Sequence, residues 1–303
     1  MLNPIYYISY DHQVFDENGN QMLHKIFSIV FVFLLFPTIS IAKNITLFGT
    51  NSQSYQFAQL LNALSYIPDK NYQLLNFNNQ IPKVRAFDFM NQSKGIDVIF
   101  GGATIARESI STPIRIPILK GLNGWRMPLI NKDKKAFFST IESMTEFKKL
   151  IPGQFHRWSD TRILESNNIH VAKGSDFEGL FQMLDKGRID YFPRSILEIN
   201  SEYQARKHLN IMIDKSLIIH YPTAYYFYVG QNNQELANDI LFGLEQAIAD
   251  GSFDSIFDKY HGEVINNIRK IKRRVFSLNN PFLSDETPLS RKKLWISLHP
   301  DNK

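Results

Sequence analysis

The stretch KGIDVIFGGATIARES, residues 94–109, decides the fold class of this chain. Its apolar centre, 95–102, has the length of one buried strand and ends in two glycines. Ahead of it, apolar runs of strand length alternate with amphipathic segments of helix length, and this order favours a mainly parallel α/β sheet. The elements expected there are strands at 44–49 and 72–77 and helices at 54–67 and 83–92.

A segment rich in proline and glycine, 111–133, interrupts the alternation, and its prolines exclude a long helix. We expect it to cross into a second lobe, where strands and helices alternate again. An extended stretch, 216–230, then returns to the first lobe. The remaining expected elements are helices at 137–150, 159–167, 176–187, 195–206, 233–251 and 253–262, and strands at 169–172, 189–192 and 210–214.

These elements predict a division of the chain into two lobes and two flanking segments. The first lobe comprises 43–120 and 228–276, and the second comprises 121–227. Residues 277–303 read as an irregular C-terminal strap. Hinge motion is expected at the crossings, near 118–126 and 222–230.

The first 42 residues are not expected to join the fold. Residues 24–42, HKIFSIVFVFLLFPTISIA, have the basic start, apolar core and small-residue end of a secretory signal peptide. We expect cleavage near Ala42 and a periplasmic protein, with an upstream extension ahead of Met22. The alternative is an uncleaved anchor, although the apolar run is shorter than the roughly 20 residues that span a bilayer.

Composition excludes several functional classes. The chain has no cysteine, so disulfides, thiolate metal sites and cysteine nucleophiles are excluded. Its net charge of +5 gathers near RKIKRR, 269–274, and the body is close to neutral. Because an exported protein rarely meets nucleic acid, a solvated helix end is the favoured interpretation, with attraction to a membrane surface as the second.

Four stretches, in this order, resemble the polar amino-acid-binding family of type II periplasmic solute-binding proteins. They are KGIDVIFGGATIARES, FFSTIESMTEFKKL, LFQMLDKGRIDYF and NQELANDILFGLEQAIADGSFDSIFDKYHG. The resemblance implies an α/β, two-lobe fold of mixed sheets with flanking helices and two crossing segments. PIRIPILKGLNGWRMPLI, WSDTRIL and DYFPRSILEI are similar to a subgroup whose ligand is unassigned.

This resemblance also implies a function. A monomer would bind a small polar ligand between its lobes and deliver it to the permease of an inner-membrane ABC transporter, without a cofactor or catalysis. Two alternatives are a ligand-sensing input for a membrane signalling partner and a dehydratase-like enzyme on the same fold. The histidines are scattered, without the spacing of a metal site.

In the family, an arginine of the first lobe binds the ligand carboxylate. Its planar guanidinium suits this role because it offers two parallel donors to the two carboxylate oxygens. Arg107 is the nearest match, and its alternative role is a surface pair with Glu108. Thr104 would add a hydroxyl contact or, equally well, cap a helix. Trp125 and Tyr191 are further expected wall residues, because aromatic side chains would exclude water from the ligand.

In the second lobe, Ser159 and Asp160 stand at an expected helix start, where free N–H groups favour an anion. The alternative for Asp160 is plain N-capping of that helix. Trp158 would form a wall of the ligand site, although a packed core aromatic is the commoner use.

One position departs from the family. Where an aspartate usually receives the ligand ammonium, this chain has Pro193, Arg194 and Ser195, and Glu198 is expected to lie out of reach. We expect Pro193 to end its strand at the cleft. The hypothesis is a ligand with anionic or polar groups at both ends, met by Arg107 and Arg194. The alternative is that Arg194 pairs with Glu198.

Overall fold

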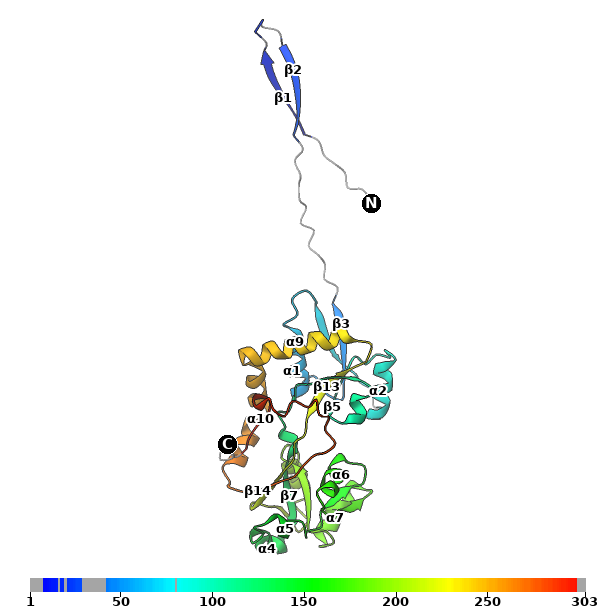
Figure 1. The fold of residues 1–303 in the computed structure, drawn as a ribbon, viewed down its shortest axis with the longest axis vertical. Helices are drawn as coiled ribbons and strands as arrows, with labels where there is room; N and C mark the ends of the chain where they lie inside the picture. Colours follow the sequence, from blue (N-terminus) through cyan, green and yellow to red (C-terminus); the bar gives the residue numbers. More distant parts are fainter. Residues whose placement is uncertain (1–7, 16, 19–20, 29–41, 80, 299–303) are drawn as a thin grey trace. The chain divides into compact units, whose positions relative to one another are not determined.

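The computed structural model describes residues 8–15, 17–18, 21–28, 42–79 and 81–298 (Figure 1). It divides into two compact units, Met1–Ile41 and Ala42–Lys303. Within the first unit, β1 (Ile8–Phe15) pairs antiparallel with β2 (Gln21–Ser28), a hairpin that the sequence analysis did not predict. Most of the predicted signal-peptide core, 29–41, lies outside the described residues. No helix in the described part of the chain has the length and apolar character needed to cross a bilayer.

The first lobe of the second unit is built on a sheet of five strands in the order β4-β3-β5-β13-β6. Strand β3 runs parallel to β4 and β5, whereas β13 is antiparallel to β5 and β6. The strands are β3 (Lys43–Phe48), β4 (Tyr72–Asn76), β5 (Val98–Gly102), β6 (Thr112–Ile114) and β13 (Tyr225–Val229). The helices are α1 (Tyr55–Leu64), α2 (Lys83–Asn91), α3 (Ile105–Glu108), α9 (Gln234–Asp250) and α10 (Ser252–Arg269).

The second lobe is built on β7, whose residues are all buried because strands flank it on both edges. The sheet has the order β10-β7-β12-β14, with β11 also on β7, and β8 pairs parallel with β9. The strands are β7 (Trp125–Asn131), β8 (Gly153–Phe155), β9 (Ala172–Gly174), β10 (Tyr191–Ser195), β11 (Ile211–Ile213), β12 (Leu217–His220) and β14 (Arg274–Ser277). The helices are α4 (Lys135–Ser139), α5 (Met144–Phe147), α6 (Ser159–Ser166), α7 (Phe177–Asp185) and α8 (Ile199–Gln204).

Strand β10 corrects the prediction that Pro193 ends a strand. It continues through Pro193 and Arg194 to Ser195, and Pro193 lies opposite Pro128 of β7. Two prolines can face each other only at a non-hydrogen-bonded pair of an antiparallel ladder, where neither N–H is needed between the two strands. On the other side of β10, Tyr191 forms a parallel bridge with Pro152, but no bridge is formed at Pro193, so its missing N–H costs no ladder bond there.

Other predicted elements shift for local reasons. The predicted helix 137–150 is two short helices, because Ser143 and Glu146 form a capping box that starts α5 anew. The predicted helix 195–206 begins only at Ile199, since Ser195 belongs to β10. The predicted strand 169–172 is displaced to β9.

The sheets also place two boundaries between the lobes at other residues than the sequence analysis predicts. Strand β13 joins the first sheet from Tyr225 on, so the return crossing is 221–224, between β12 and β13. Strand β14, which we had assigned to the first lobe, pairs parallel with β12 in the second sheet. The chain therefore passes between the lobes a third time after α10.

Helices α1 and α9 pack very closely on the first lobe (Figure 1). A Cβ atom on Gly243 of α9 would lie 1.9 Å from the carbonyl oxygen of Ala63 in α1. Only a residue without a side chain allows this approach. The close packing of α1 and α9 therefore requires glycine at position 243.

We predict that Gly243→Ala destabilises the protein by about 2 kcal/mol or more, because the added methyl forces the helices apart. Gly262→Ala in α10 is the matched control, since the nearest atom to its new Cβ is 3.9 Å away. The control should be neutral or gain up to about 1 kcal/mol from helix propensity. Urea unfolding of both variants checks this, and equal stabilities would contradict it.

Candidate functional site

The two central crossings meet backbone to backbone. The first, 115–124, ends at Gly124, whose carbonyl oxygen accepts from the N–H of Tyr221 at 3.2 Å. A Cβ on Gly124 would lie 2.0 Å from the Tyr221 carbonyl oxygen. Next to this contact, the rings of Trp125 and His220 stack with centroids 4.1 Å apart. The crossings therefore hold the start of β7 at the base of the cleft between the lobes.

Arg126, the second residue of β7, forms a buried ion pair across the second lobe. Its Nη2 lies 2.7 Å from Oδ1 of Asp160, and the Tyr221 hydroxyl donates to the same oxygen. Burial by itself would lower the pKa of Arg126, but the nearby Asp160 carboxylate and the tyrosines more than offset it. The pKa of Arg126 is therefore raised and the guanidinium stays charged.

Two adjoining cavities, of about 130 and 640 Å³, lie between the lobes and share several wall residues. Elements of both lobes line them, as the sequence analysis predicted for a ligand site. The shared wall residues are Thr104, Arg107, Arg126, Ser159, Asp160 and Tyr225.

The first-lobe side of the cleft carries two cations without a counter-charge. Arg107 donates to the carbonyl oxygen of Gly102, and no carboxylate of the described residues pairs with it. Its predicted alternative partner, Glu108, pairs instead with Arg115 at 2.9 Å. Lys83 is exposed as a whole residue, but it lines the smaller cavity, and its ammonium lies beside the backbone of Gly101 in β5.

The environment of Lys83 makes its charge costly. Burial of the ammonium, and then the charge of Arg107, lower the pKa of Lys83 to about 8. Lys83 makes no ion pair or hydrogen bond with any residue that the structure describes. An anion between Lys83 and Arg107 would remove both the desolvation cost and the mutual repulsion.

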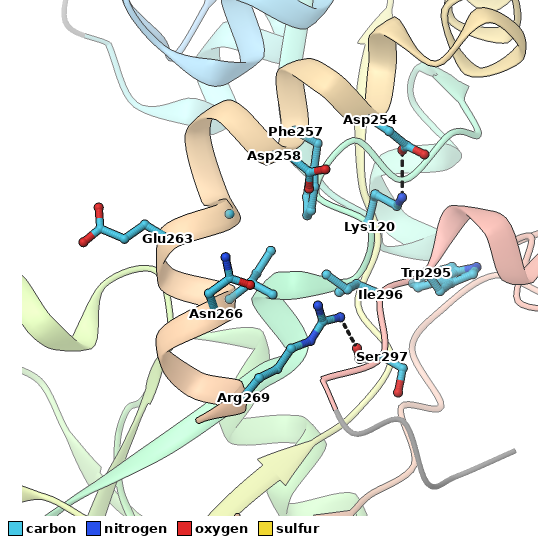
Figure 2. A pocket seen from close by; sticks show the side chains of 12 residues that line it. Lys120, Asp254, Phe257, Asp258, Glu263, Asn266, Arg269, Trp295, Ile296 and Ser297 are labelled. Atoms are coloured by element: carbon cyan, nitrogen blue, oxygen red, sulfur yellow. Dashed lines mark hydrogen bonds and ion pairs between the residues drawn. The ribbon is translucent and has the colours of Figure 1, made fainter. Parts of the chain in front are cut away.

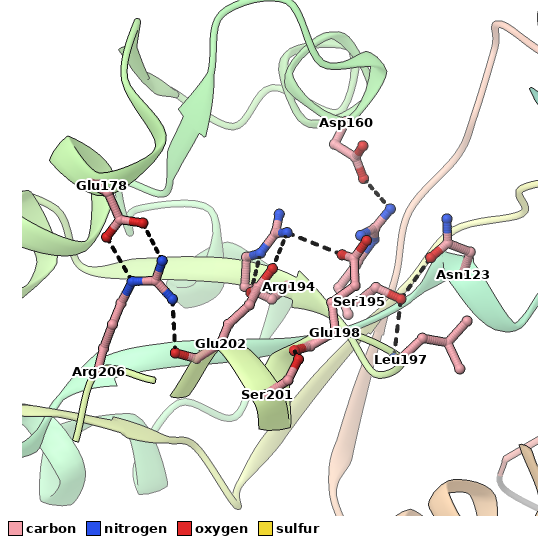
Figure 3. Close-up of polar contacts among 11 residues, drawn as sticks. Asn123, Asp160, Glu178, Arg194, Ser195, Leu197, Glu198, Ser201, Glu202 and Arg206 are labelled. Atoms are coloured by element: carbon pink, nitrogen blue, oxygen red, sulfur yellow. Dashed lines mark hydrogen bonds and ion pairs between the residues drawn. The ribbon is translucent and has the colours of Figure 1, made fainter. Parts of the chain in front are cut away.

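Arg194 is paired within the second lobe (Figure 3). Its Nε and Nη2 donate to the two carboxylate oxygens of Glu202 at 2.7 and 2.6 Å, and Nη2 also reaches Glu198 at 3.1 Å. The guanidinium lies over the rings of Trp158 and Phe192 at 4.7 and 5.1 Å. Arg194 lines the larger cavity, as predicted, but with only 6% of the residue exposed its charge is already matched within the second lobe.

Glu198 corrects the expectation that it lies out of reach. It precedes α8 and lines the larger cavity, with 49% of its side chain exposed. The reason is that β10 extends to Ser195, so Glu198 follows the strand end at once and is not one helical turn inside a helix. A carboxylate is thus available in the cleft.

The other predicted site residues fall into two groups. Thr104 caps α3, accepting from the N–H of Arg107 at 3.2 Å, while it lines both cavities. Ser159 starts α6 and lines both cavities as well. Asp160 does not cap this helix, because its carboxylate is held by Arg126. Trp158 lines the larger cavity and stacks on Phe192.

Two predicted wall residues lie outside the cleft. Tyr191 is fully buried between Phe138 and Phe147 in the second-lobe core. Trp125 is buried against His220 and lines neither interlobe cavity. In both cases the alternation along a strand points the ring to the packed face of the sheet.

Sequence reasoning missed several residues of the cleft. Lys83, Arg126 and Tyr225 line it, and so do Asn280 and Phe282 of the C-terminal strap. Arg126 had a usable signal, because a charge inside an otherwise apolar extended run must find a partner when it is buried. Within the described residues, no cluster of three or more histidine, aspartate or glutamate side chains could hold a metal ion.

A third cavity, of about 900 Å³, lies between α10 and the end of the strap (Figure 2). Its cations already have partners, since Lys120 pairs with Asp254 at 2.8 Å and Arg269 donates to the carbonyl oxygen of Ser297. The interlobe cleft is the better ligand site, because its charges on the first-lobe side are unmatched.

No protein-family model and no curated protein matches this sequence, but solved structures match it in fold. One is ytmK of Bacillus subtilis, a probable amino-acid ABC transporter extracellular-binding protein, with 14% identity, a TM-score of 0.55, and coverage of 74% of this chain and 99% of that chain. Another is a structure described under glutathione import via GshT and the cystine ABC importer TcyBC of Streptococcus mutans. It has 15% identity and a TM-score of 0.51, and the match covers 73% of this chain and 96% of that chain. These likenesses confirm the predicted two-lobe fold of type II periplasmic binding proteins.

We predict that Asp160→Asn destabilises the protein by about 3 kcal/mol or more, because it leaves the Arg126 charge buried without a partner. The matched control is Glu165→Gln on the same helix, whose pair with Lys173 is largely exposed, with 40% of the Glu165 side chain accessible. That loss should stay below about 1 kcal/mol. Thermal and urea unfolding compare the two, and similar losses would argue against a stabilising role of the buried pair.

Proposed function

We propose that this chain is an exported solute-binding protein that captures a small anionic or amino-acid-like molecule between its lobes and delivers it to an ABC transporter. The observation that carries the proposal is the pair of unmatched cations, Lys83 and Arg107, facing an interlobe cavity. Arg107 is half-buried and Lys83 is exposed at the cavity wall. Their charges repel each other, so an anion between them is favoured.

The ligand presents its anionic group to the first lobe. Arg107 offers two parallel donors to a carboxylate, and Lys83 adds a point charge. On the second lobe, the half-exposed Glu198 accepts from Arg194 through one carboxylate oxygen, and its other oxygen can accept from a ligand ammonium group. This arrangement fits an acidic or neutral amino acid as well as a dianion, and it replaces the earlier hypothesis of a clamp between Arg107 and Arg194.

The crossings suit a hinge. Segments 115–124 and 221–224 are short and lie against each other, so small backbone rotations there would swing one lobe against the other. Closure around a ligand would bring Arg107 and Glu198 to the same molecule. The descriptions of the two solved structures of the same fold name an ABC transporter and an ABC importer, which supports a transporter as the partner.

We propose export and delivery to a transporter, with ligand sensing as the alternative. The predicted periplasmic location rests on the N-terminal sequence pattern and is supported by the extracellular-binding role of ytmK. A sensing role would use the same cleft and differ only in the partner that receives the closed form. The predicted monomer and the predicted absence of a cofactor stay predictions.

We predict that the full chain binds at least one of L-glutamate, L-glutamine, succinate and glutathione, and that Lys83→Gln and Arg107→Gln each weaken binding about 10- to 100-fold. The reason is that a hydrogen bond to a charged group contributes about 1.5–3 kcal/mol. Lys94→Gln, an exposed first-lobe lysine outside the cavities, is the matched control. Isothermal titration calorimetry measures this, and tight binding that neither cleft variant weakens would refute the proposed site.

We also predict a pH dependence from Lys83. Because its pKa is lowered to about 8, the ammonium is charged below that pH and neutral above it. Affinity for an anion should therefore be steady below about pH 7 and fall as pH rises to about 9, by up to about tenfold. Titrations of wild type and Lys83→Gln at a series of pH values test this, and the variant should show a flatter profile.

A further inference from the structure

The C-terminal strap, 278–298, begins on the second lobe. Leu278 is buried in the second-lobe core, directly after β14. Asn279 then forms a reciprocal pair with Asn167 at the end of α6: its N–H donates at 2.9 Å, and its carbonyl accepts at 2.8 Å. This end of the strap is therefore fixed to the helix that carries Asp160.

The strap ends on the first lobe. Both oxygens of Glu245 in α9 accept from Arg291 at 2.5 Å. Lys293 donates to the carbonyl oxygen of Ile248 in α9 at 3.0 Å, and the carbonyl oxygen of Ser297 accepts from Arg269 of α10 at 2.8 Å. The strap is thus anchored at both ends, on different lobes.

The passage between the lobes occurs at two neighbouring residues. Phe282 packs against the second-lobe core, and its ring lies 4.2 Å from the Arg162 guanidinium of α6. Leu283 packs against a first-lobe cluster that includes Phe87 of α2. Both residues also line the smaller interlobe cavity, as Lys83 does.

Asn280 connects this passage to the hinge. Its side-chain amide donates to the carbonyl oxygen of Pro222, in the return crossing, at 2.8 Å. The lobes are therefore joined by four segments, namely 115–124, 221–224, 270–273 and the strap, and the strap lies beside the ligand cavity.

From these contacts we infer that the strap is a latch on the cleft: Phe282 and Leu283 hold the two lobes together in the ligand-free protein. Adjacent residues of an extended chain are only 3.80 Å apart, so two side chains on different lobes cannot both stay in place when those lobes separate. Opening requires one of them to leave its contacts. The inference rests on the hinge motion of the proposed function, and it makes Phe282 and Leu283 positioning residues.

The test measures the distance between the lobes without any ligand. Because the chain has no cysteine, Asp88→Cys in α2 and Lys186→Cys at the end of α7 place one spin label on each lobe of the full chain. Double electron–electron resonance then reports the distribution of distances. The strap variants are the double change Phe282→Ala with Leu283→Ala, and a short Gly-Ser insertion after the exposed Asp285, which lengthens the strap and keeps its contacts.

The matched control is Leu289→Ala, which removes the same kind of side chain from the strap at a residue that is 50% exposed and lines neither interlobe cavity. We expect a longer-distance population in the double variant that is absent from wild type and Leu289→Ala. The insertion alone should give little opening, because the latch contacts remain, and it should increase opening when combined with the double variant. If the double variant does not fold, Phe282→Ala alone replaces it.

Identical distance distributions in wild type, the double variant and Leu289→Ala would overturn the inference. The result is independent of ligand identity. Calorimetry with L-glutamate, L-glutamine, succinate and glutathione reports separately on the proposed function. If the protein binds one of these compounds and its strap variants stay closed, the proposed function is supported and the latch inference is refuted.

Discussion

The architecture depends on the contact between Gly124 and Tyr221. A side chain at position 124 would collide with the Tyr221 carbonyl oxygen, so the two crossings can lie together only where glycine stands. This contact sets the start of β7 against the end of β12 and brings Arg126 to the base of the cleft. The Tyr221 hydroxyl then meets Asp160, which ties α6 to the same point. The second-lobe wall of the cleft follows from one close approach of two backbones.

Charge pairing separates the structural residues of the cleft from its candidate ligand contacts. Arg126 is neutralised by Asp160, and Arg194 by Glu202, so both arginines stabilise the second lobe. Lys83 and Arg107 have no such partners in the described part of the chain. The first-lobe wall of the cleft therefore presents positive charge, which a bound anion can neutralise. The second-lobe wall is mixed, since Arg157 and Arg162 line it as well as Glu198. The cleft as a whole therefore favours a ligand whose negative group dominates or is joined to one positive group.

The fold was predictable from the sequence to the extent that it depends on local pattern. The apolar strand 95–102 and the long closing helices lie close to where their periodicity places them. The prediction that Pro193 ends a strand was wrong, because the residue that makes it tolerable is Pro128, distant in sequence and opposite in the sheet. That error also put Glu198 out of the cleft. Tyr191 was wrongly placed in the site, since its side of the strand is decided by what packs on the sheet.

By itself, the sequence determined the order of strands and helices, the proline-rich crossing and the arginine that follows the glycine-ended strand β5, because each depends on residues near one another in the chain. Only the tertiary structure decided which charges are paired, since Arg126 and Asp160 are distant in the sequence and meet only in the folded chain, whereas Lys83 and Arg107 lie close together without a carboxylate partner among the described residues. It also decided the path of the strap. Irregular segments have no period to read, so their place is set by the surfaces that Phe282 and Leu283 bury.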